Sequence, residues 1–186
     1  MNTNAEQVSC LILAGGEGKR FGGVDKGLVT FENTPFIEHT LAVLEPQVDE
    51  IIISANRNID IYKKYGYRVI PDISDGYRGP LAGIAAGLPQ CTNDRILVVP
   101  CDMPFLPGNL VERLSNAGKD ISIAESGSKL QLVFLMDKKL QASIQHSLEN
   151  DQLRLMQWVK SHHPAIIHFA DDRAFRNFNS RDDLDE

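Results

Sequence analysis

The sequence predicts an α/β fold: a Rossmann-like, doubly wound and mostly parallel sheet with helices on both faces. Three observations predict it. Apolar, strand-like runs alternate with amphipathic segments along the chain, which is the pattern of a sheet built from β-α-β units. The runs at 51–53 and 96–99 are continuously apolar, as expected for strands that are covered on both faces. A glycine-rich segment directly follows the first strand, at the sheet edge where such folds bind ligands.

The first part of the chain is predicted to contain four strands, each followed by a helix. Residues 35–44 carry apolar side chains near helical spacing, and Pro35 stands near the start of that segment, where proline is favoured. Gly66 follows the second helical segment, as a helix-ending glycine does. The predicted strands are 8–14, 50–55, 68–70 and 95–99, and the predicted helices are 35–44, 59–65, 81–88 and 107–116.

The second part of the chain is less regular. We expect strands at 121–124, 130–136 and 165–169, helices at 138–148 and 152–160, and a last strand at 175–178. Ser180 is a candidate cap of a short C-terminal helix. No linker is long enough to divide the chain, so residues 1–186 are predicted to form one domain.

Composition excludes several classes of function. The formal net charge is -6, which argues against broad nucleic-acid binding. The three cysteines, Cys10, Cys91 and Cys101, show no C-x-x-C spacing and fit reduced thiols in a cytoplasmic protein. No secretory signal precedes Val8, and no apolar stretch approaches the ~20 residues that span a membrane.

The glycine-rich segment at 15–27 predicts a phosphate-binding loop of unusual type. It holds six of the chain's 14 glycines and three basic residues, Lys19, Arg20 and Lys26. Glycines let backbone N–H groups approach phosphate oxygens closely. The segment matches neither the P-loop, which needs Ser or Thr after its lysine, nor the dinucleotide fingerprint, whose third glycine is replaced by Phe21. The alternative, a flexible surface connection, explains poorly why the glycines follow an apolar strand.

Two aspartates are candidates for ligand chemistry. Asp102 follows the strand at 95–99 and suits a Mg²⁺ ion, which prefers one or two carboxylates together with substrate phosphates. Asp72 follows the strand at 68–70 and is suited to a base, a ribose hydroxyl or an outer-shell water. A turn or capping role is the alternative for both. Lys26 is the loop lysine best placed to meet a triphosphate, and Arg20 is the second choice, because its planar fork suits phosphate.

Two more segments are candidates for ligand contact. Gly79, Pro80 and Leu81 open a predicted helix, whose free N–H groups can bind an anion or the edge of a base. Asn177 and Asn179 alternate around an apolar residue, so a strand would point both amides the same way, toward a ligand or a metal. On spacing alone, the solvent-exposed face of a strand is the favoured reading of that pair.

Several of these segments resemble one family. Leu-Ala-Gly-Gly at 13–16 with Arg20, followed by Gly-Gly-Val-Asp-Lys-Gly-Leu at 22–28, resembles the signature of the molybdenum cofactor guanylyltransferases. The first part is shared with the wider nucleotidyltransferases that have a Rossmann-like domain, whereas the second part is narrower. The segments 79–83, 100–104 and 177–179 resemble further blocks of the family. The resemblance runs from about residue 8 to residue 114, with weaker support to the C-terminus.

The resemblance implies a nucleotide-diphospho-sugar transferase-like fold and a reaction in which GTP and molybdenum–molybdopterin give the guanine dinucleotide form and pyrophosphate. It implies a nucleotide-binding half at 8–116 and a molybdopterin-binding half at 117–186. Mg²⁺ would be held by Asp102, and Lys26, Arg20 and Asp102 would be catalytic. Asn177 and Asn179 would contact the pterin or a second metal. The implied nucleotide contacts are Leu13, Ala14, Gly15, Gly16, Lys26, Ser54, Asp72, Gly79, Pro80, Leu81 and Asp102.

Two departures from the family pattern affect these expectations. Ser54 stands where the family often has an asparagine that contacts GTP, and a serine hydroxyl reaches less far. Leu132, after Gln131, stands where the family has a proline in its pterin-facing half.

Expected partners are GTP, molybdenum–molybdopterin, and proteins that deliver molybdopterin or mature molybdoenzymes. Neither nucleic acid nor a membrane is an expected partner.

Two alternative functions stay open on the sequence. One is a cytidylyl- or sugar-phosphate nucleotidylyltransferase of the same fold, which a nucleotide competition assay would separate. The other is a carrier that holds nucleotide or molybdopterin without catalysis. Lys26 and Asp102 argue against the carrier, because binding alone does not require a metal-linked carboxylate.

Overall fold

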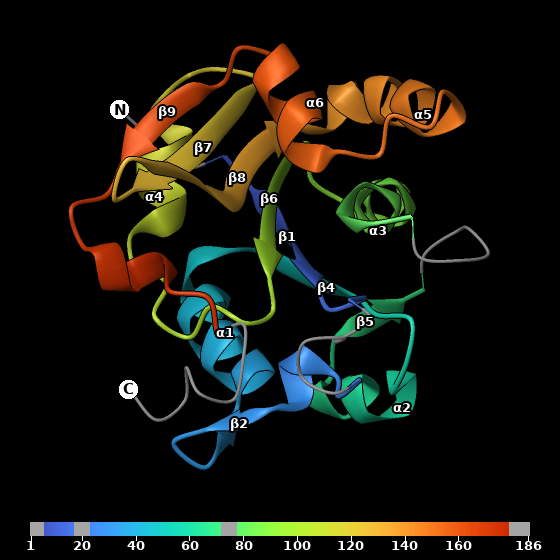
Figure 1. Ribbon diagram of the computed structural model, residues 1–186, viewed down its shortest axis with the longest axis vertical. Helices are drawn as coiled ribbons and strands as arrows, with labels where there is room; N and C mark the ends of the chain where they lie inside the picture. The colour runs from blue at the N-terminus through green and yellow to red at the C-terminus, as the bar shows by residue number, and fades with distance from the viewer. Residues whose placement is uncertain (1–5, 17–22, 72–77, 179–186) are drawn as a thin grey trace.

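In the computed structural model, which describes residues 6–16, 23–71 and 78–178, a seven-stranded sheet runs through the centre of the molecule (Figure 1). The strand order is β5-β4-β1-β6-β8-β7-β9. Only β8 runs against its two neighbours, and the other pairings are parallel. The strands are β1 (Val8–Leu13), β4 (Glu50–Ser54), β5 (Arg68–Ile70), β6 (Arg95–Pro100), β7 (Ile121–Ser126), β8 (Lys129–Asp137) and β9 (Ala165–His168).

Helices cover both faces of this sheet, as the sequence predicts. One face packs against α1 (Phe36–Leu44), α2 (Ile59–Tyr62) and α4 (Leu110–Ser115). The other packs against α3 (Pro80–Gly87), α5 (Gln141–Glu149) and α6 (Leu155–Ser161). Short 3₁₀ turns occur at η2 (Lys26–Leu28), η3 (Glu45–Gln47), η4 (Lys63–Tyr65), η5 (Leu88–Gln90), η6 (Lys138–Leu140) and η7 (Asp172–Phe175).

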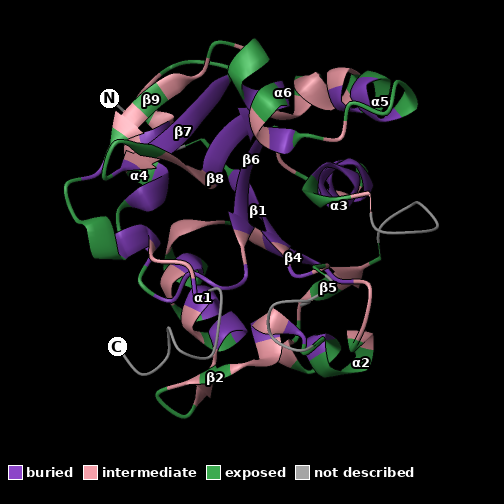
Figure 2. Ribbon diagram, viewed as in Figure 1, coloured by how far each residue is buried: buried purple, intermediate pink, exposed green. Residues whose placement is uncertain are grey.

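The core lies in two layers because successive strand residues point to opposite faces. In β4, Ile51 and Ile53 pack into the layer with α1 and α2, and Ile52 packs into the layer with α3. Figure 2 shows the central strands as buried and α3 as largely buried, with the exposed residues on the outer turns and on the outer helices. Each fully buried isoleucine contributes about 1.5–3 kcal/mol to stability. The continuous apolar runs in the sequence are therefore explained by burial on both faces.

Most predicted elements are confirmed, and the differences have local causes. The predicted helix at 59–65 divides into α2 and the turn η4, and Gly66 ends it with a φ of 84°. The helix predicted from 107 begins at Leu110, since Pro107 and its neighbours form a turn closed by the Leu110 N–H donating to the Pro107 carbonyl at 3.1 Å. The helices predicted at 138–148 and 152–160 begin later, at Gln141 and Leu155.

Two features of the fold differ from the predictions. The strand predicted at 175–178 is wrong: η7 occupies 172–175, and the residues up to 178 have no regular structure. A small hairpin of β2 (Thr30–Phe31) and β3 (Thr34–Pro35) was not predicted; in it Glu32 and Asn33 turn with φ of 51° and 64°. Such two-residue turns favour asparagine. Ser180 lies outside the described residues.

The carboxyl ends of the four parallel strands meet at one edge of the sheet. The Ala14 N–H donates to the Ser54 carbonyl at 2.7 Å, and the Cys101 N–H donates to the Leu13 carbonyl at 3.1 Å. The Ala55 N–H continues the row with a 2.9 Å bond to the Ile70 carbonyl. The loops that follow these strands therefore start side by side. Among the described helices, none is long and apolar enough to cross a membrane.

Candidate nucleotide-binding site

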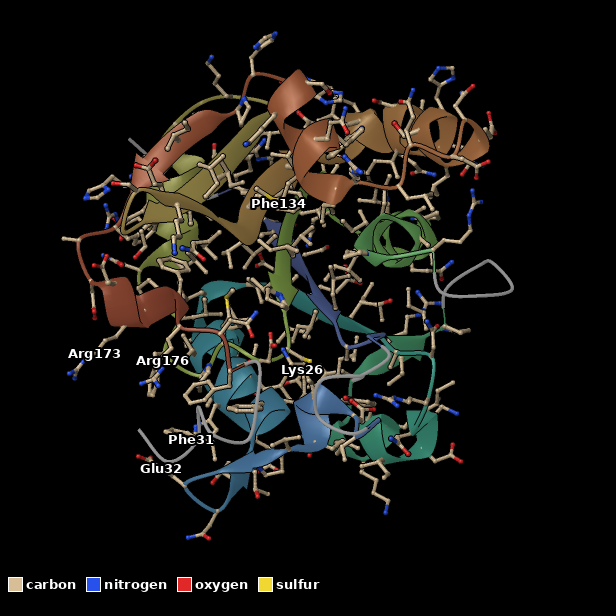
Figure 3. All side chains as sticks on the ribbon, in the orientation of Figure 1. Lys26, Phe31, Glu32, Phe134, Arg173 and Arg176 are labelled. Atoms are coloured by element: carbon tan, nitrogen blue, oxygen red, sulfur yellow. The ribbon has the colours of Figure 1, made fainter. Side chains whose placement is uncertain are left out.

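Lys26, Asp102 and Asn177 come together at this edge of the sheet. Lys26 opens the turn η2 after the glycine-rich loop, and Asp102 follows β6. The Lys26 Nζ lies 2.5 Å from the Asp102 Oδ2 and 3.2 Å from the Asn177 Oδ1. Figure 3 places Lys26 just beyond the ends of the central strands. Segments that are remote in sequence thus supply one cation and two oxygen groups to one point.

The Asp102 carboxylate has little contact with solvent. Its side chain is 5% exposed, whereas that of Lys26 is 24% exposed. Burial raises the pKa of Asp102, and the charge and hydrogen bond of the Lys26 ammonium oppose that rise. A buried carboxylate is costly unless a cation compensates it. The site is therefore one that attracts positive charge, which Lys26 supplies.

Asn177 reaches Lys26 because the following residue anchors the chain. Phe178 is buried, with its ring centroid 4.9 Å from that of Phe31 and 5.1 Å from that of Phe36. The Arg176 guanidinium lies 5.2 Å from the same ring, within the range of a cation–π contact. Phe31 and Arg176 are labelled in Figure 3. Asn177 is thus placed by aromatic packing rather than by a strand.

Asp25, which was not among the predicted site residues, connects η2 to α2. It caps η2 by accepting from the Gly27 N–H at 3.3 Å. Its carboxylate also accepts from the Tyr62 hydroxyl at 2.6 Å and from the Asn58 amide at 3.1 Å. Asp25 is buried, so these donors replace its water. The sequence signal for this role was the position of Asp25 directly before Lys26, because a capping aspartate fixes where the turn that carries the lysine begins.

The loop and strand-end candidates differ in their access to a ligand. Gly16 is exposed and Gly15 and Leu13 are half-buried, whereas Ala14 is buried at the end of β1. Ser54, at the end of β4, is only 1% exposed. A ligand could therefore reach the backbone of Gly15 and Gly16, whereas the Ser54 hydroxyl is buried.

The segment at 79–81 opens α3 beside this edge. Gly79 has a φ of 75°, a conformation that other residues rarely adopt, and Pro80 is the first helical residue. Both are exposed, whereas the Leu81 side chain is buried in the core. A ligand would therefore meet only the backbone of Leu81. Three further candidates, Arg20, Asp72 and Asn179, lie outside the described residues.

A shallow groove adjoins the start of α3. Its volume is 740 Å³. Arg154 and Lys160 add positive charge to a lining that is otherwise largely apolar, and Leu132 of β8 is one of its apolar residues. The lining residues are Pro80, Leu132, Leu153, Arg154, Leu155, Met156, Gln157 and Lys160.

The described residues could supply some, but not all, of the ligands of a metal ion. No group of three or more His, Cys, Asp and Glu side chains that could hold a metal occurs in the described part of the chain. Asp102 and Asn177 offer oxygen atoms around a position that already holds an ammonium group. That donor set fits Mg²⁺, which is usually bound by one or two carboxylates together with phosphates and water.

Solved structures of nucleotidyltransferases share this fold. Molybdopterin-guanine dinucleotide biosynthesis protein A from Archaeoglobus fulgidus matches with a TM-score of 0.74 and 21% identity, covering 95% of this chain and 95% of that one. A 4-diphosphocytidyl-2C-methyl-D-erythritol synthase from Anaerococcus prevotii matches with a TM-score of 0.75 and 16% identity, covering 96% and 93%. These likenesses show that the chain has a fold that nucleotidyltransferases adopt.

Sequence comparison shows which class and which family the chain belongs to. The model of the MobA-like NTP transferase domain matches residues 10–165. The molybdenum cofactor guanylyltransferase of Shewanella putrefaciens is 42% identical over 93% of this chain and 92% of its own length. That of Shewanella halifaxensis is 41% identical over 94% and 90%. The chain belongs to the molybdenum cofactor guanylyltransferase family. Nucleotidyltransferases of this kind typically use a divalent metal ion.

Proposed function

We propose that this enzyme transfers GMP from GTP to molybdenum–molybdopterin, forming the molybdopterin guanine dinucleotide cofactor and pyrophosphate. Its family membership supports the reaction. The single structural observation that carries the proposal is the pairing of Lys26 with the buried Asp102 at the sheet edge where Gly15 and Gly16 present accessible backbone. A carrier would gain nothing from a buried carboxylate held next to a lysine, because burial makes the carboxylate costly.

The nucleotide contacts follow from what is accessible. We assign the phosphates to the backbone of Gly15 and Gly16 and to the Lys26 ammonium. Gly79 and Pro80, both exposed at the start of α3, would border another part of the nucleotide, and free N–H groups in the first turn of that helix would donate to it. Pro80 itself has no N–H and would offer only contact surface. Asp72 and Arg20 remain proposed contacts on the strength of the sequence motifs. Ser54 would contribute little to the nucleotide contact, since its side chain is buried.

The reaction is an in-line displacement at the α-phosphorus of GTP. An oxygen of the molybdopterin phosphate forms a bond to that phosphorus, the bond from phosphorus to the β-bridging oxygen breaks, and pyrophosphate leaves with the electron pair. The attacking phosphate is already ionised near neutral pH, so no general base is required. Lys26 would offset the charge that grows on pyrophosphate. Catalysis then consists of positioning and charge stabilisation.

Asp102 would hold Mg²⁺, with Asn177 as a second oxygen donor or as a contact to the pterin. When bound, the ion would polarise and orient the phosphate groups of the substrate. Asp102 and Asn177 would hold the ion next to Lys26, which contacts both oxygen groups in this structure. The Lys26 ammonium would then bind phosphate beside the ion.

The groove beside α3 is the proposed position of the pterin substrate. It begins at Pro80, next to the nucleotide segment, and its other lining residues come from the half of the chain at 117–186. Its apolar floor suits a flat ring system, and Arg154 and Lys160 suit the phosphate. Leu132, which replaces the family's proline, is one of the lining residues.

Proteins that deliver molybdopterin or receive the finished cofactor are the further partners we expect. A cytoplasmic location is also proposed. Its support is that Cys10, Cys91 and Cys101 are all buried free thiols, as expected for a reducing compartment.

The test is pyrophosphate release from GTP, CTP and ATP, each with Mg²⁺ and with molybdopterin-loaded protein present or omitted. Release with GTP alone, and only with molybdopterin, is the expected result. Release with CTP would move the chain to the cytidylyltransferases without changing the fold or the chemistry. Binding of GTP without release from any nucleotide would support the carrier function and overturn the proposal.

A further inference from the structure

The Arg57 side chain joins the two ends of the glycine-rich loop. Its Nη1 donates to the Gly23 carbonyl at 2.7 Å. Its Nη2 donates to the Gly16 carbonyl at 3.1 Å and to the Val24 carbonyl at 2.9 Å. Gly16 stands just after β1, whereas Gly23 and Val24 lead into η2 and Lys26. One guanidinium thus ties the end of the first strand to the residues that precede the lysine.

Arg57 and the next residue, Asn58, both contact residues at the ends of the glycine-rich loop. It lies between β4 and α2, and its side chain is 26% exposed. The Arg57 Nε is 3.9 Å from the Asp25 Oδ2, and the next residue, Asn58, donates to that same carboxylate. The backbone carbonyls are therefore held by Arg57, and the capping carboxylate is held by Asn58.

These contacts orient the peptide groups of the loop. The C=O and N–H of a trans peptide point in opposite directions within one plane. A guanidinium that holds the Gly23 and Val24 carbonyls therefore also sets the directions of the Val24 and Asp25 N–H groups. The planar fork of arginine bonds several acceptors at once, whereas a lysine ammonium on a flexible chain does not reproduce that geometry.

We propose that Arg57 is a positioning residue for the nucleotide. It sets the backbone of Gly16, Gly23 and Val24, and with it the start of η2 at Lys26, before GTP binds. Holding these residues in advance lowers the entropy cost of binding and of reaching the reactive geometry. The inference rests on the proposed function, because it assumes that this loop receives the phosphates of GTP.

The experiment compares the wild-type protein with Arg57→Ala, Arg57→Lys and the control Arg68→Ala. Arg68 is an exposed arginine on β5 that bonds one carbonyl, that of Gln90, at 3.3 Å. Pyrophosphate release gives KM for GTP and kcat, and binding of a fluorescent GTP analogue gives Kd without turnover. Amide hydrogen exchange of the protein without ligand reports on residues 12–16 and 23–28. Added guanidinium ion tests chemical rescue.

We expect Arg57→Ala to raise KM and Kd by about tenfold to a hundredfold, on the scale of a few lost charge-assisted hydrogen bonds. Exchange should quicken at 12–16 and 23–28 but stay slow in β4 and β6. Guanidinium should restore part of the affinity to Arg57→Ala and none to the control, and Arg57→Lys should stay impaired.

Two results would overturn the inference: unchanged exchange and nucleotide affinity in Arg57→Ala, or an exchange increase spread through the whole sheet with no rescue by guanidinium. A wild-type protein that releases no pyrophosphate would sink the proposed function instead. In that event the exchange and binding data would still decide the role of Arg57.

Discussion

The Lys26 ammonium lies 2.5 Å from the Asp102 Oδ2, although 76 positions separate the two residues in sequence. The contact exists because η2 and the end of β6 meet at the same edge of the sheet. Burial raises the pKa of Asp102, and the Lys26 charge opposes this. The Lys26 ammonium therefore compensates the charge of the buried Asp102 carboxylate, and we expect the two residues to act as one unit in binding phosphates.

The first prediction concerns Asp102→Asn. This change keeps the shape of the side chain but removes the negative charge that would hold Mg²⁺. We expect kcat for pyrophosphate release to fall by about a hundredfold to a thousandfold, and the Mg²⁺ concentration for half-maximal activity to rise. Steady-state assays over a range of Mg²⁺ concentrations would measure both.

Asp120→Asn is the matched control. Asp120 also pairs with a lysine, Lys139, at 2.6 Å, but both side chains are more than half exposed on the surface. That variant should keep wild-type kinetics, since exposed pairs contribute ~0–1 kcal/mol. Wild-type turnover in a folded Asp102→Asn protein, shown by an unchanged melting temperature, would remove Asp102 from the mechanism.

Local patterns in the sequence were sufficient to predict the doubly wound sheet. Strands covered on both faces leave continuous apolar runs, and glycine and proline mark the ends of helices. The hairpin at 30–35 was missed because strands of two residues have no periodicity to detect. The prediction of a strand at 175–178 was wrong because the apolar residues there serve tertiary packing and not a sheet. Phe178 packs against Phe31 and Phe36.

The candidate site was predicted unevenly for a related reason. Asp102 follows a recognisable strand end and Lys26 lies in the loop after another, so the topology predicted that both segments start at the same edge of the sheet. The roles of Asp25, Arg57 and Tyr62 depend on contacts between separate elements, and residue type alone does not reveal such contacts. Asn177 was singled out, but the reason for its position, an aromatic anchor, was visible only in three dimensions.

The second prediction tests the contact assigned to Ser54. Its side chain is 1% exposed, so its hydroxyl should contribute little to binding GTP. Ser54→Ala should change KM for GTP by less than about threefold, which corresponds to well under 1 kcal/mol. A loss of affinity beyond tenfold, measured by titration with a GTP analogue in a protein of normal stability, would show that the hydroxyl does reach the nucleotide.

The third prediction concerns Phe178, which anchors Asn177 beside Lys26. Phe178→Ala should cost about 3–5 kcal/mol of unfolding free energy, as is usual for a buried phenylalanine. It should also lower kcat per folded molecule, because Asn177 loses its anchor. Urea unfolding and activity measured well below the melting temperature would separate these two effects.

Phe134→Ala provides the comparison for Phe178→Ala. Phe134 is fully buried in β8 and far along the sheet from Lys26 in Figure 3. It should lose a similar amount of stability while the folded fraction keeps its activity. Equal activity per folded molecule in the two variants would mean that the anchor does not position Asn177 for catalysis.

The fourth prediction concerns the close packing of Gly27. A Cβ added there would lie 2.4 Å from the Tyr62 hydroxyl oxygen and 3.1 Å from the Cys101 sulfur. Gly27→Ala should therefore destabilise the protein by about 1–3 kcal/mol and raise KM for GTP, because η2 and Lys26 would be displaced. Gly108→Ala, where an added Cβ meets no atom within 4 Å, should be close to neutral.

Tyr62→Phe makes this prediction specific. Alone, it removes the hydroxyl that donates to Asp25 at 2.6 Å and should cost about 1–3 kcal/mol, the usual penalty for leaving a buried acceptor short of a donor. Combined with Gly27→Ala, it also removes the atom that would clash most closely. The double variant should consequently lose less stability than the sum of the two single variants, by an amount that urea unfolding can measure. Strict additivity would mean that the added methyl group is accommodated by movement of η2 away from α2, and that Tyr62 does not fix the position of the lysine turn.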